Sequence, residues 1–157
     1  MKILVMSDMH GCVSGFERAL EKESDAKNVI FLGDGFKKAE ELSFMYDDRN
    51  FYMVPGNCDG FEMFSPATKI IKINGTKILI THGHAFSVKS SLTALKQRAI
   101  LEEVKIAFYG HTHIADIKNE NGIWFINPGT LAGYNGLSSY ATVQINDKGI
   151  FPKIERL

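Results

Sequence analysis

The chain has 157 residues, of which 45% are hydrophobic and 23% are charged, a balance typical of a globular protein and not of a disordered one. Lysine plus arginine and aspartate plus glutamate number 18 each, so the composition indicates no specific nucleic-acid binding. No run approaches the roughly 18 apolar residues of a membrane span, and residues 1–7 are too short a run for a signal peptide. We therefore expect a single domain over residues 1–157, cytoplasmic and without membrane contact.

Strands and helices are expected to alternate in the first half of the chain. Short apolar runs predict strands at residues 3–6, 28–32 and 50–54, and apolar residues at helical spacing predict helices at 15–23 and 36–46. In the second helix, Phe36, Ala39, Leu42 and Met45 share the face expected to point inward.

The second half begins with a hairpin signal, because Asn74-Gly75 separates two isoleucine-rich runs. A helix is predicted at about 88–102, with Leu92, Leu95, Ala99 and Leu101 or its neighbours inward. Further strands are predicted at 105–109, 114–119, 122–126, 139–146 and 149–154. The whole pattern favours the α/β class, as a four-layer α/β/β/α sandwich of two packed mixed sheets flanked by helices. Exposed edge strands in this half make a homo-oligomer a reasonable expectation.

All five histidines follow strand-like runs, in three short clusters. His10 follows the first run, His82 and His84 follow residues 78–80, and His111 and His113 follow residues 106–109. Two other runs end in Gly33-Asp34-Gly35 and in residues 55–59, which contain Asn57, Cys58 and Asp59. Ligands of open α/β sheets gather outside the carboxyl ends of the strands, so we expect these side chains to meet.

The side chains at these strand ends are of the types that bind transition-type divalent cations. Asp8 and His10 are one residue apart, as are His111 and His113, so each pair can face the same pocket. Gly33 is expected to let the backbone at Asp34 approach a metal closely. The candidate ligands are Asp8, His10, Asp34, Asn57, His82, His111 and His113. Seven ligands exceed what one cation needs but suit two cations with a bridging carboxylate.

The motifs Asp-x-His, Gly-Asp, Gly-Asn-x-Asp, His-Gly-His and Gly-His-x-His, in that order, resemble those of the calcineurin-like metallophosphoesterase superfamily. The short length, the Gly-Asn-Cys-Asp form and Asn127-Pro128-Gly129-Thr130 resemble its small prokaryotic, YfcE-type phosphodiesterase branch. The resemblance implies a phosphodiesterase that depends on a dinuclear metal centre. In that reaction a metal-bridging hydroxide attacks phosphorus in line with the leaving oxygen.

The resemblance also assigns ligands to each of two divalent cations. It implies one cation at Asp8, His10, Asp34 and His113, and a second at Asp34, Asn57, His82 and His111. Manganese is the favoured identity, with nickel, iron, cobalt and zinc as alternatives, because this ligand set suits all of them.

Three further residues are candidates for catalytic work. His84 would contact the phosphoryl oxygens, support the ligands or protonate the leaving group, and the alternative is a purely structural role. Many relatives carry histidine at the position of Cys58, which is either a small packed residue here or an ionised thiol beside the cations. Two roles are open for Asp59: its carboxylate supports the metal ligands, or it caps a helix or turn. Cys12, where relatives often carry asparagine, is expected to be structural.

The substrate is predicted to be a small phosphodiester, because no arginine stands next to a motif to pair with the extra charge of a monoester. Phe36, Phe61, Phe64 and Tyr134 either shape a substrate cleft or belong to the edge of the core. Two alternatives remain open. One is a metal-dependent phosphomonoesterase, and the other is a non-catalytic scaffold on the same fold, as in a retromer subunit of this superfamily.

Overall fold

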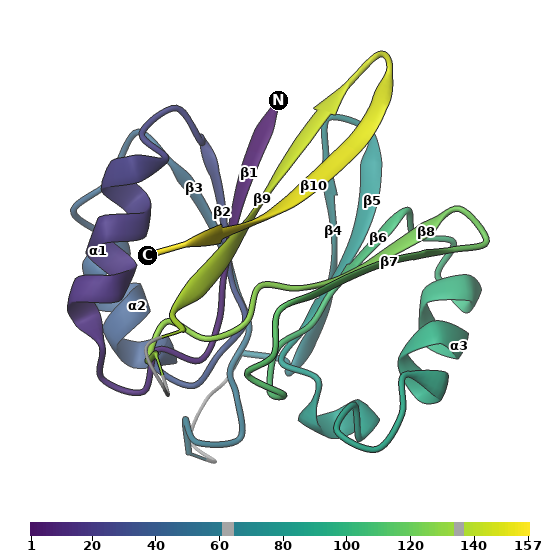
Figure 1. Cartoon of the computed structure of the whole chain (residues 1–157), viewed down its shortest axis with the longest axis horizontal. Coiled ribbons are helices and arrows are strands. Elements are labelled where there is room, and N and C mark those ends of the chain that lie inside the picture. The colour runs from purple at the N-terminus through teal and green to yellow at the C-terminus, as the bar shows by residue number, and fades with distance from the viewer. Residues whose placement is uncertain (61–64, 134–136) are drawn as a thin grey trace.

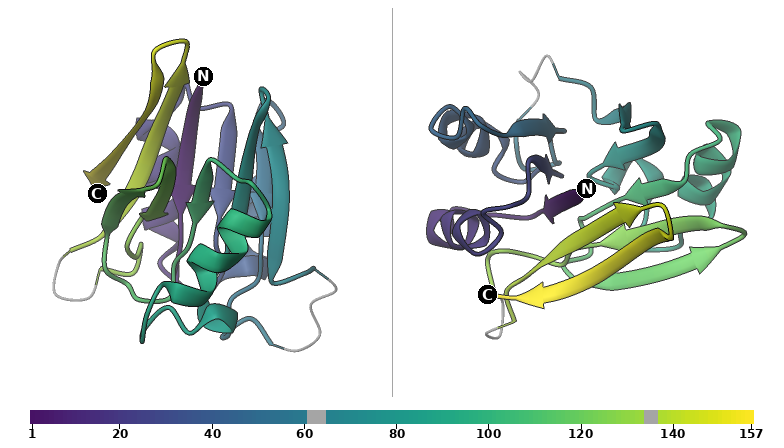
Figure 2. Two further views of the ribbon diagram at one scale, coloured as in Figure 1. Left: turned by 90° about the vertical axis from the view of Figure 1, so that its right-hand side faces the viewer. Right: turned by 90° about the horizontal axis from the view of Figure 1, so that it is seen from above.

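The structure, a computed structural model, describes residues 1–60, 65–133 and 137–157. Two five-stranded sheets pack face to face, and helices cover the outer face of each sheet (Figure 1). Within the described residues the α-helices are α1 (Val13–Lys22), α2 (Phe36–Ser43) and α3 (Thr93–Leu101), with a short 3-10 helix η1 at His84–Phe86. The predicted α/β/β/α sandwich is confirmed, and Figure 2 shows its layers from two further sides.

The first sheet has the strand order β10-β9-β1-β2-β3. Its strands are β1 (Lys2–Met6), β2 (Asn28–Phe31), β3 (Asn50–Met53), β9 (Ser139–Asn146) and β10 (Gly149–Arg156). β1, β2 and β3 are parallel, so their carboxyl ends meet at one edge. β9 and β10 pair antiparallel on the other side of β1.

The second sheet has the strand order β4-β5-β6-β8-β7. Its strands are β4 (Thr68–Ile73), β5 (Thr76–Thr81), β6 (Ile106–Phe108), β7 (Asp116–Glu120) and β8 (Ile123–Asn127). The predicted hairpin is present, with Asn74 and Gly75 both at positive φ between β4 and β5. β5, β6 and β8 are parallel, so this sheet also gathers its loops at one edge.

Three apolar clusters hold the layers together. The central cluster lies between the sheets and takes fully buried residues from both, such as Ile3, Val5, Ile80 and Phe108. A second cluster packs the first sheet against α1 and α2, and a third packs the second sheet against α3. Both sheets are therefore buried on two faces at their middle strands, which explains why β1, β2 and β5 read as continuous apolar runs.

Two helices are shorter than the sequence predicts. α2 ends at Ser43, so Met45 lies beyond it and is 63% exposed. α3 begins at Thr93, and the residues before it form η1 and turns in which Ser87 has a positive φ. Leu95 and Ala99 are buried as expected, but Leu101 lies on the opposite helical face from Ala99 and is 80% exposed. The inward positions predicted for Met45 and Leu101 are therefore wrong.

Of the four aromatic residues considered for a substrate cleft, Phe36 is buried at the start of α2, as core. Phe61, Phe64 and Tyr134 lie outside the described residues. Among the helices of the described residues, none is both long enough and apolar enough to traverse a lipid bilayer.

Candidate metal centre

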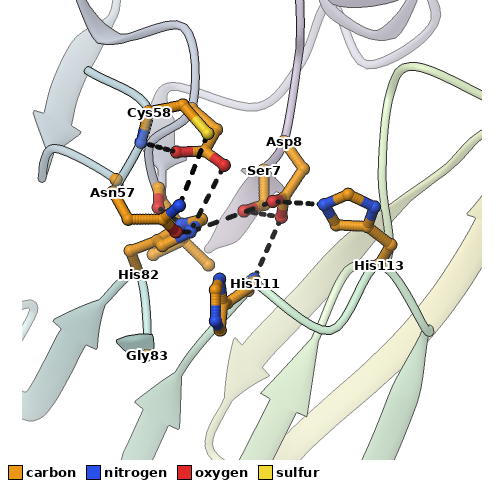
Figure 3. Close-up of polar contacts among 12 residues, drawn as sticks. Ser7, Asp8, Asn57, Cys58, His82, Gly83, His111 and His113 are labelled. Atoms are coloured by element: carbon orange, nitrogen blue, oxygen red, sulfur yellow. Dashed lines mark hydrogen bonds and ion pairs between the residues drawn. The ribbon is translucent and has the colours of Figure 1, made fainter. Parts of the chain in front are cut away.

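The seven candidate ligands lie in loops at the carboxyl ends of five parallel strands. Asp8 and His10 follow β1, Asp34 follows β2, and Asn57 follows β3. His82 follows β5, and His111 and His113 follow β6. The first sheet therefore supplies four of these residues and the second sheet supplies three. Figure 3 shows Asp8 and Asn57 of the first sheet facing His82, His111 and His113 of the second.

One half of the cluster contains Asp8, His10, Asp34 and His113. One potential ligand atom from each residue lies within 4.8 Å of all the others, which is the spacing of donors around a single cation. His113 Nε2 lies 3.0 Å from Asp8 Oδ1 and 3.2 Å from His10 Nε2, and His10 Nε2 lies 3.5 Å from Asp34 Oδ2. These four residues are the set that the family resemblance implies for one cation.

The other half contains Asn57, His82 and His111 beside Asp34. His82 Nε2 lies 3.0 Å from Asn57 Oδ1 and 3.6 Å from Asp34 Oδ2. The ring centroids of His82 and His111 are 5.0 Å apart. Asp34 Oδ2 thus faces a histidine from each half, as a bridging carboxylate would.

His82 is held as a neutral ring with a defined tautomer. Its Nδ1 lies 2.7 Å from the carbonyl oxygen of Leu32, which can only accept, so Nδ1 carries the proton and donates it. Burial lowers the pKa of His82 to about 4, against the opposing effect of Asp34. At neutral pH the lone pair of Nε2 therefore points at Asn57 and Asp34, as in a metal-ligating histidine.

Asp8 is fully buried, and its two oxygens have different surroundings. Oδ2 accepts hydrogen bonds from Ser7 Oγ at 2.5 Å and from the His111 backbone N–H at 3.1 Å. Oδ1 is buried and accepts no hydrogen bond from the described residues, although His113 Nε2 lies 3.0 Å away. Burial raises the pKa of Asp8 to about 6. A buried carboxylate oxygen with an open lone pair fits a bound cation, which would supply the missing partner.

Asp34 is ionised at neutral pH despite its burial. Burial, the largest influence, would raise its pKa, but the hydrogen bond that Oδ1 accepts from the Cys58 N–H and the electrostatic interactions with the neighbouring histidine rings outweigh it. The net result is a pKa below the usual value for aspartate. A second carboxylate is therefore available to hold positive charge at the centre of the cluster.

Five of the seven candidate ligands have a left-handed backbone. Asp8, His10, Asp34, His111 and His113 have φ between 41° and 67°, a region that residues other than glycine rarely adopt. Such conformations cost about 1–3 kcal/mol each and persist where surrounding contacts fix them. Backbone strain is therefore concentrated at the candidate ligands.

Gly33 allows the loops after β2 and β3 to pack closely. A side chain there would collide with the backbone of Gly56, because the loops after β2 and β3 touch. A side chain at Gly56 would in turn collide with Asp34 Oδ1. The two glycines therefore bring Asn57 and Asp34 together by close packing of their loops.

Two polar side chains of the Asn127-Pro128-Gly129-Thr130 motif fix the ligand loops. Asn127 Nδ2 donates to the carbonyl oxygen of Gly110 and to Thr112 Oγ1, both at 3.0 Å, and so holds the loop that carries His111. Thr130 Oγ1 donates to the carbonyl oxygen of Asp8 at 2.8 Å. This segment, which the sequence analysis gave only as part of the family resemblance, therefore holds the loops of Asp8 and His111 in place.

Asp59 accepts hydrogen bonds from four backbone N–H groups. Oδ1 accepts from Gly35 and Phe36 at the start of α2, and Oδ2 accepts from Asp34 and Gly56. All four distances lie between 2.7 and 2.8 Å. One carboxylate thus serves both alternatives left open by the sequence, because it caps α2 and joins the loops of two candidate ligands. These contacts support a positioning role for Asp59.

Cys58 and His84 border the cluster. Cys58 is exposed, and Asn57 Nδ2 lies 3.4 Å from its sulfur. In the absence of cations, partial desolvation of the thiol and the neighbouring Asp34 raise the pKa of Cys58. His84 lies next to His82, with ring centroids 5.3 Å apart, and lines a cavity of about 390 Å³ together with Asn57. Cys12 stands at the N-cap of α1, in agreement with a structural role.

The sequence also gave no indication of Lys89. Burial lowers the pKa of both His111 and His113, and the positive charge of Lys89 lowers it further. Lys89 is exposed and follows the turns after η1, far along the chain from the loop after β6. The ammonium group of Lys89 therefore adds a positive charge near His111 and His113.

Comparison with known proteins places this arrangement in a family. The sequence matches the Calcineurin-like phosphoesterase superfamily domain over residues 1–148. It is 28% identical to phosphodiesterase YfcE of Escherichia coli K12, over 98% of this chain and 97% of that protein. A predicted phosphoesterase from Streptococcus pneumoniae superposes with a TM-score of 0.85 at 28% identity, over 99% of this chain and 88% of that one. Vps29 of Entamoeba histolytica, solved with zinc, superposes with a TM-score of 0.75 at 25% identity, over 100% and 98%. The chain belongs to the calcineurin-like phosphoesterase superfamily.

Proposed function

We propose that the protein is a phosphodiesterase that uses two divalent cations held by the seven clustered residues. The observation that carries this proposal is the position of Asp34, whose Oδ2 faces His10 in one half of the cluster and His82 in the other. One cation would be held by Asp8, His10, Asp34 and His113, and the other by Asp34, Asn57, His82 and His111. Bound cations of this kind polarise phosphoryl oxygens and lower the pKa of water.

We favour manganese because the donors are carboxylate, amide oxygen and imidazole, with no thiolate among them. Carboxylate and carbonyl oxygens suit manganese, and imidazole suits zinc, iron and nickel as well. The two aspartates bring two negative charges, which compensate part of the charge of two dications. This donor set therefore supports the predicted cofactors without a requirement for one metal.

The residues of the chain divide the remaining work. His82 presents Nε2 because Leu32 accepts from Nδ1, and Asp59 keeps the Asp34 and Asn57 loops in place. His84 lines the cavity beside Asn57 and is the proposed proton donor to the departing oxygen. Cys58 is proposed to be dispensable for substrates whose leaving group needs no proton.

A chelator-stripped sample reloaded with manganese tests the function. We expect metal-dependent turnover of bis-(p-nitrophenyl) phosphate above that of p-nitrophenyl phosphate, with loss of both activities in His111→Ala. Asp25→Asn, which changes an exposed carboxylate paired with Lys2, is the matched control and should retain full activity.

Two other results would contradict the proposed phosphodiesterase function and favour an alternative. Turnover of the monoester alone would show a phosphomonoesterase. Absence of turnover with manganese, nickel, iron, cobalt and zinc, in protein shown to bind metal, would favour a scaffold on this fold.

A further inference from the structure

The cavity beside the cluster shares two residues with the proposed reaction centre. It is lined by Asn57 and His84, and also by Ser65 and Ala67, which lie just before β4. Its volume of about 390 Å³ falls in the lower part of the range for small-molecule sites, roughly 300–1,000 Å³. A molecule bound at the cluster therefore has an adjoining space for one organic group of moderate size.

The chemistry of the lining limits what that group can be. Among the described residues that line the cavity there is no aspartate, glutamate, lysine or arginine. A charged group that entered would gain no ionic partner from these described residues, whereas an uncharged group needs none. Glycine, alanine, proline and serine supply most of the wall, so the space is set by small side chains.

The imidazole of His84 lies on one side of the cavity and can contact a bound group. Nδ1 of His84 is buried and has no hydrogen-bond partner in the part of the chain that the structure describes. The ring therefore acts on a bound group through Nε2. A group that occupies the cavity is next to this imidazole on one side and next to Asn57 on the other.

We infer that this cavity binds the departing arm of the diester, an uncharged aryl or sugar-like alcohol, and that Ala67 limits the size of that arm. The inference rests on the proposed phosphodiesterase function. In the reaction, water loses a proton and forms the new bond to phosphorus, and the bond from phosphorus to the departing oxygen breaks. His84 is the proposed donor of a proton to that oxygen, so an alcohol leaves as a neutral molecule, whereas an acidic phenol can leave as the phenolate.

Two substrates with the same retained methyl group test the inference. Methyl p-nitrophenyl phosphate and methyl 4-methylumbelliferyl phosphate have leaving groups of similar acidity, but the second is larger. In Ala67→Leu the added side chain fills space that the larger arm needs, so the ratio of kcat/KM for the larger to the smaller substrate should fall about tenfold. Ala67→Ser, which barely changes the volume, and Leu101→Trp, at an exposed site on α3 outside this cavity, should leave the ratio unchanged.

A binding measurement separates the cavity from the chemistry. The free product 4-methylumbelliferone, below its own pKa and therefore neutral, should bind the wild-type protein. Its dissociation constant, measured by fluorescence, should rise about tenfold in Ala67→Leu. Binding with this dependence in a protein that hydrolyses neither substrate would disprove the phosphodiesterase and leave the cavity as a binding site.

Equal loss of activity on both substrates, or a dissociation constant unchanged by Ala67→Leu, would overturn the inference. Ser65→Leu narrows the same cavity from another position and is used if Ala67→Leu does not fold, as judged by thermal unfolding. The same drop in the ratio is then expected of Ser65→Leu.

Discussion

Asp8 is a residue whose position lowers the stability of the cation-free protein. Its pKa is raised to about 6 by burial, above the reference value of 3.8. The folded state therefore binds a proton more tightly than the unfolded state does. By linkage, the free energy of unfolding falls as the pH rises from about 4 to about 6 and stays reduced above that range.

Asp8→Asn should remove this penalty. An amide oxygen can still accept from Ser7 and from the His111 N–H, and the amide NH₂ can donate to His113. In the presence of a chelator we expect the variant to be more stable than wild type near neutral pH, by at most about 3 kcal/mol. Urea unfolding at about pH 7.5 and about pH 4 checks this, because the difference should vanish at the lower pH. A destabilisation of equal size at both pH values would refute the prediction.

The proposal for Cys58 is tested in the same cluster. Cys58→Ala should keep kcat/KM for bis-(p-nitrophenyl) phosphate within about threefold of wild type, because nitrophenolate departs without a proton and general acids contribute little there. His84→Ala measured with a poorer leaving group is the comparison, and it should lose about 100-fold. Near-complete loss of activity in Cys58→Ala would instead make the thiol a catalytic residue.

At the scale of elements, the start of α2 and the loop after β3 depend on one carboxylate. Asp59 accepts from Gly35 and Phe36 at the helix N-terminus, where a negative charge is also favoured by the helix dipole. Its other oxygen accepts from Asp34 and Gly56. The helix end and the two ligand loops should therefore loosen together when this side chain changes.

Asp59→Asn should destabilise the protein by about 2–6 kcal/mol. The new NH₂ group faces two backbone N–H donors that lose their acceptor, and each unpaired donor costs about 1–3 kcal/mol. Asp48→Asn is the matched control, because Asp48 is exposed and pairs with Lys27 at the surface, where ion pairs contribute little. Chemical denaturation of both variants measures the difference. Similar stability of the two would mean that Asp59 does not organise these loops.

The sequence predicted the elements better than their ends. Alternating and continuous apolar runs located the strands, but the segment before α3 folds into η1 and turns, although its apolar spacing is helical. Backbone conformation there depends on contacts such as the hydrogen bond from the Val88 N–H to the carbonyl oxygen of Gly83, which the apolar spacing does not encode.

At the candidate site, too, the sequence predicted which residues come together but not the contacts that orient them. Asp8, His10, Asp34 and His113 could be grouped because each follows a parallel strand, and parallel strands share an edge. The contacts that orient these side chains could not be predicted. Asn127 and Asp59 act through backbone groups, and Lys89 acts on histidines that are distant along the chain.

At the scale of the whole molecule, each proposed cation would join the two sheets. The first cation takes Asp8, His10 and Asp34 from one sheet and His113 from the other. The second takes Asp34 and Asn57 from the first sheet and His82 and His111 from the second. Binding in the folded state alone stabilises it by mass action, by about 2.7 kcal/mol at 100 times the dissociation constant.

Manganese should therefore raise the Tm of stripped protein by about 5–10 °C, and chelator should reverse the shift. The shift should be smaller in His113→Ala and smaller in His111→Ala, because each removes a ligand contributed by the second sheet. Asp25→Asn, altered on the exposed surface, should respond as wild type does. A Tm that is indifferent to manganese in every variant would contradict cation binding between the sheets.

The left-handed backbone of five cluster residues has a consequence for laboratory evolution. Glycine adopts this conformation at little cost, whereas a side chain there costs about 1–2 kcal/mol. Selection of random variants for heat resistance alone, in a medium without metal, should accumulate glycine at His10, Asp34 and His113. Selection for turnover should keep carboxylate and imidazole at the same codons. The two populations would diverge first where the chain is most strained, so resistant survivors would be the ones that had lost the cluster.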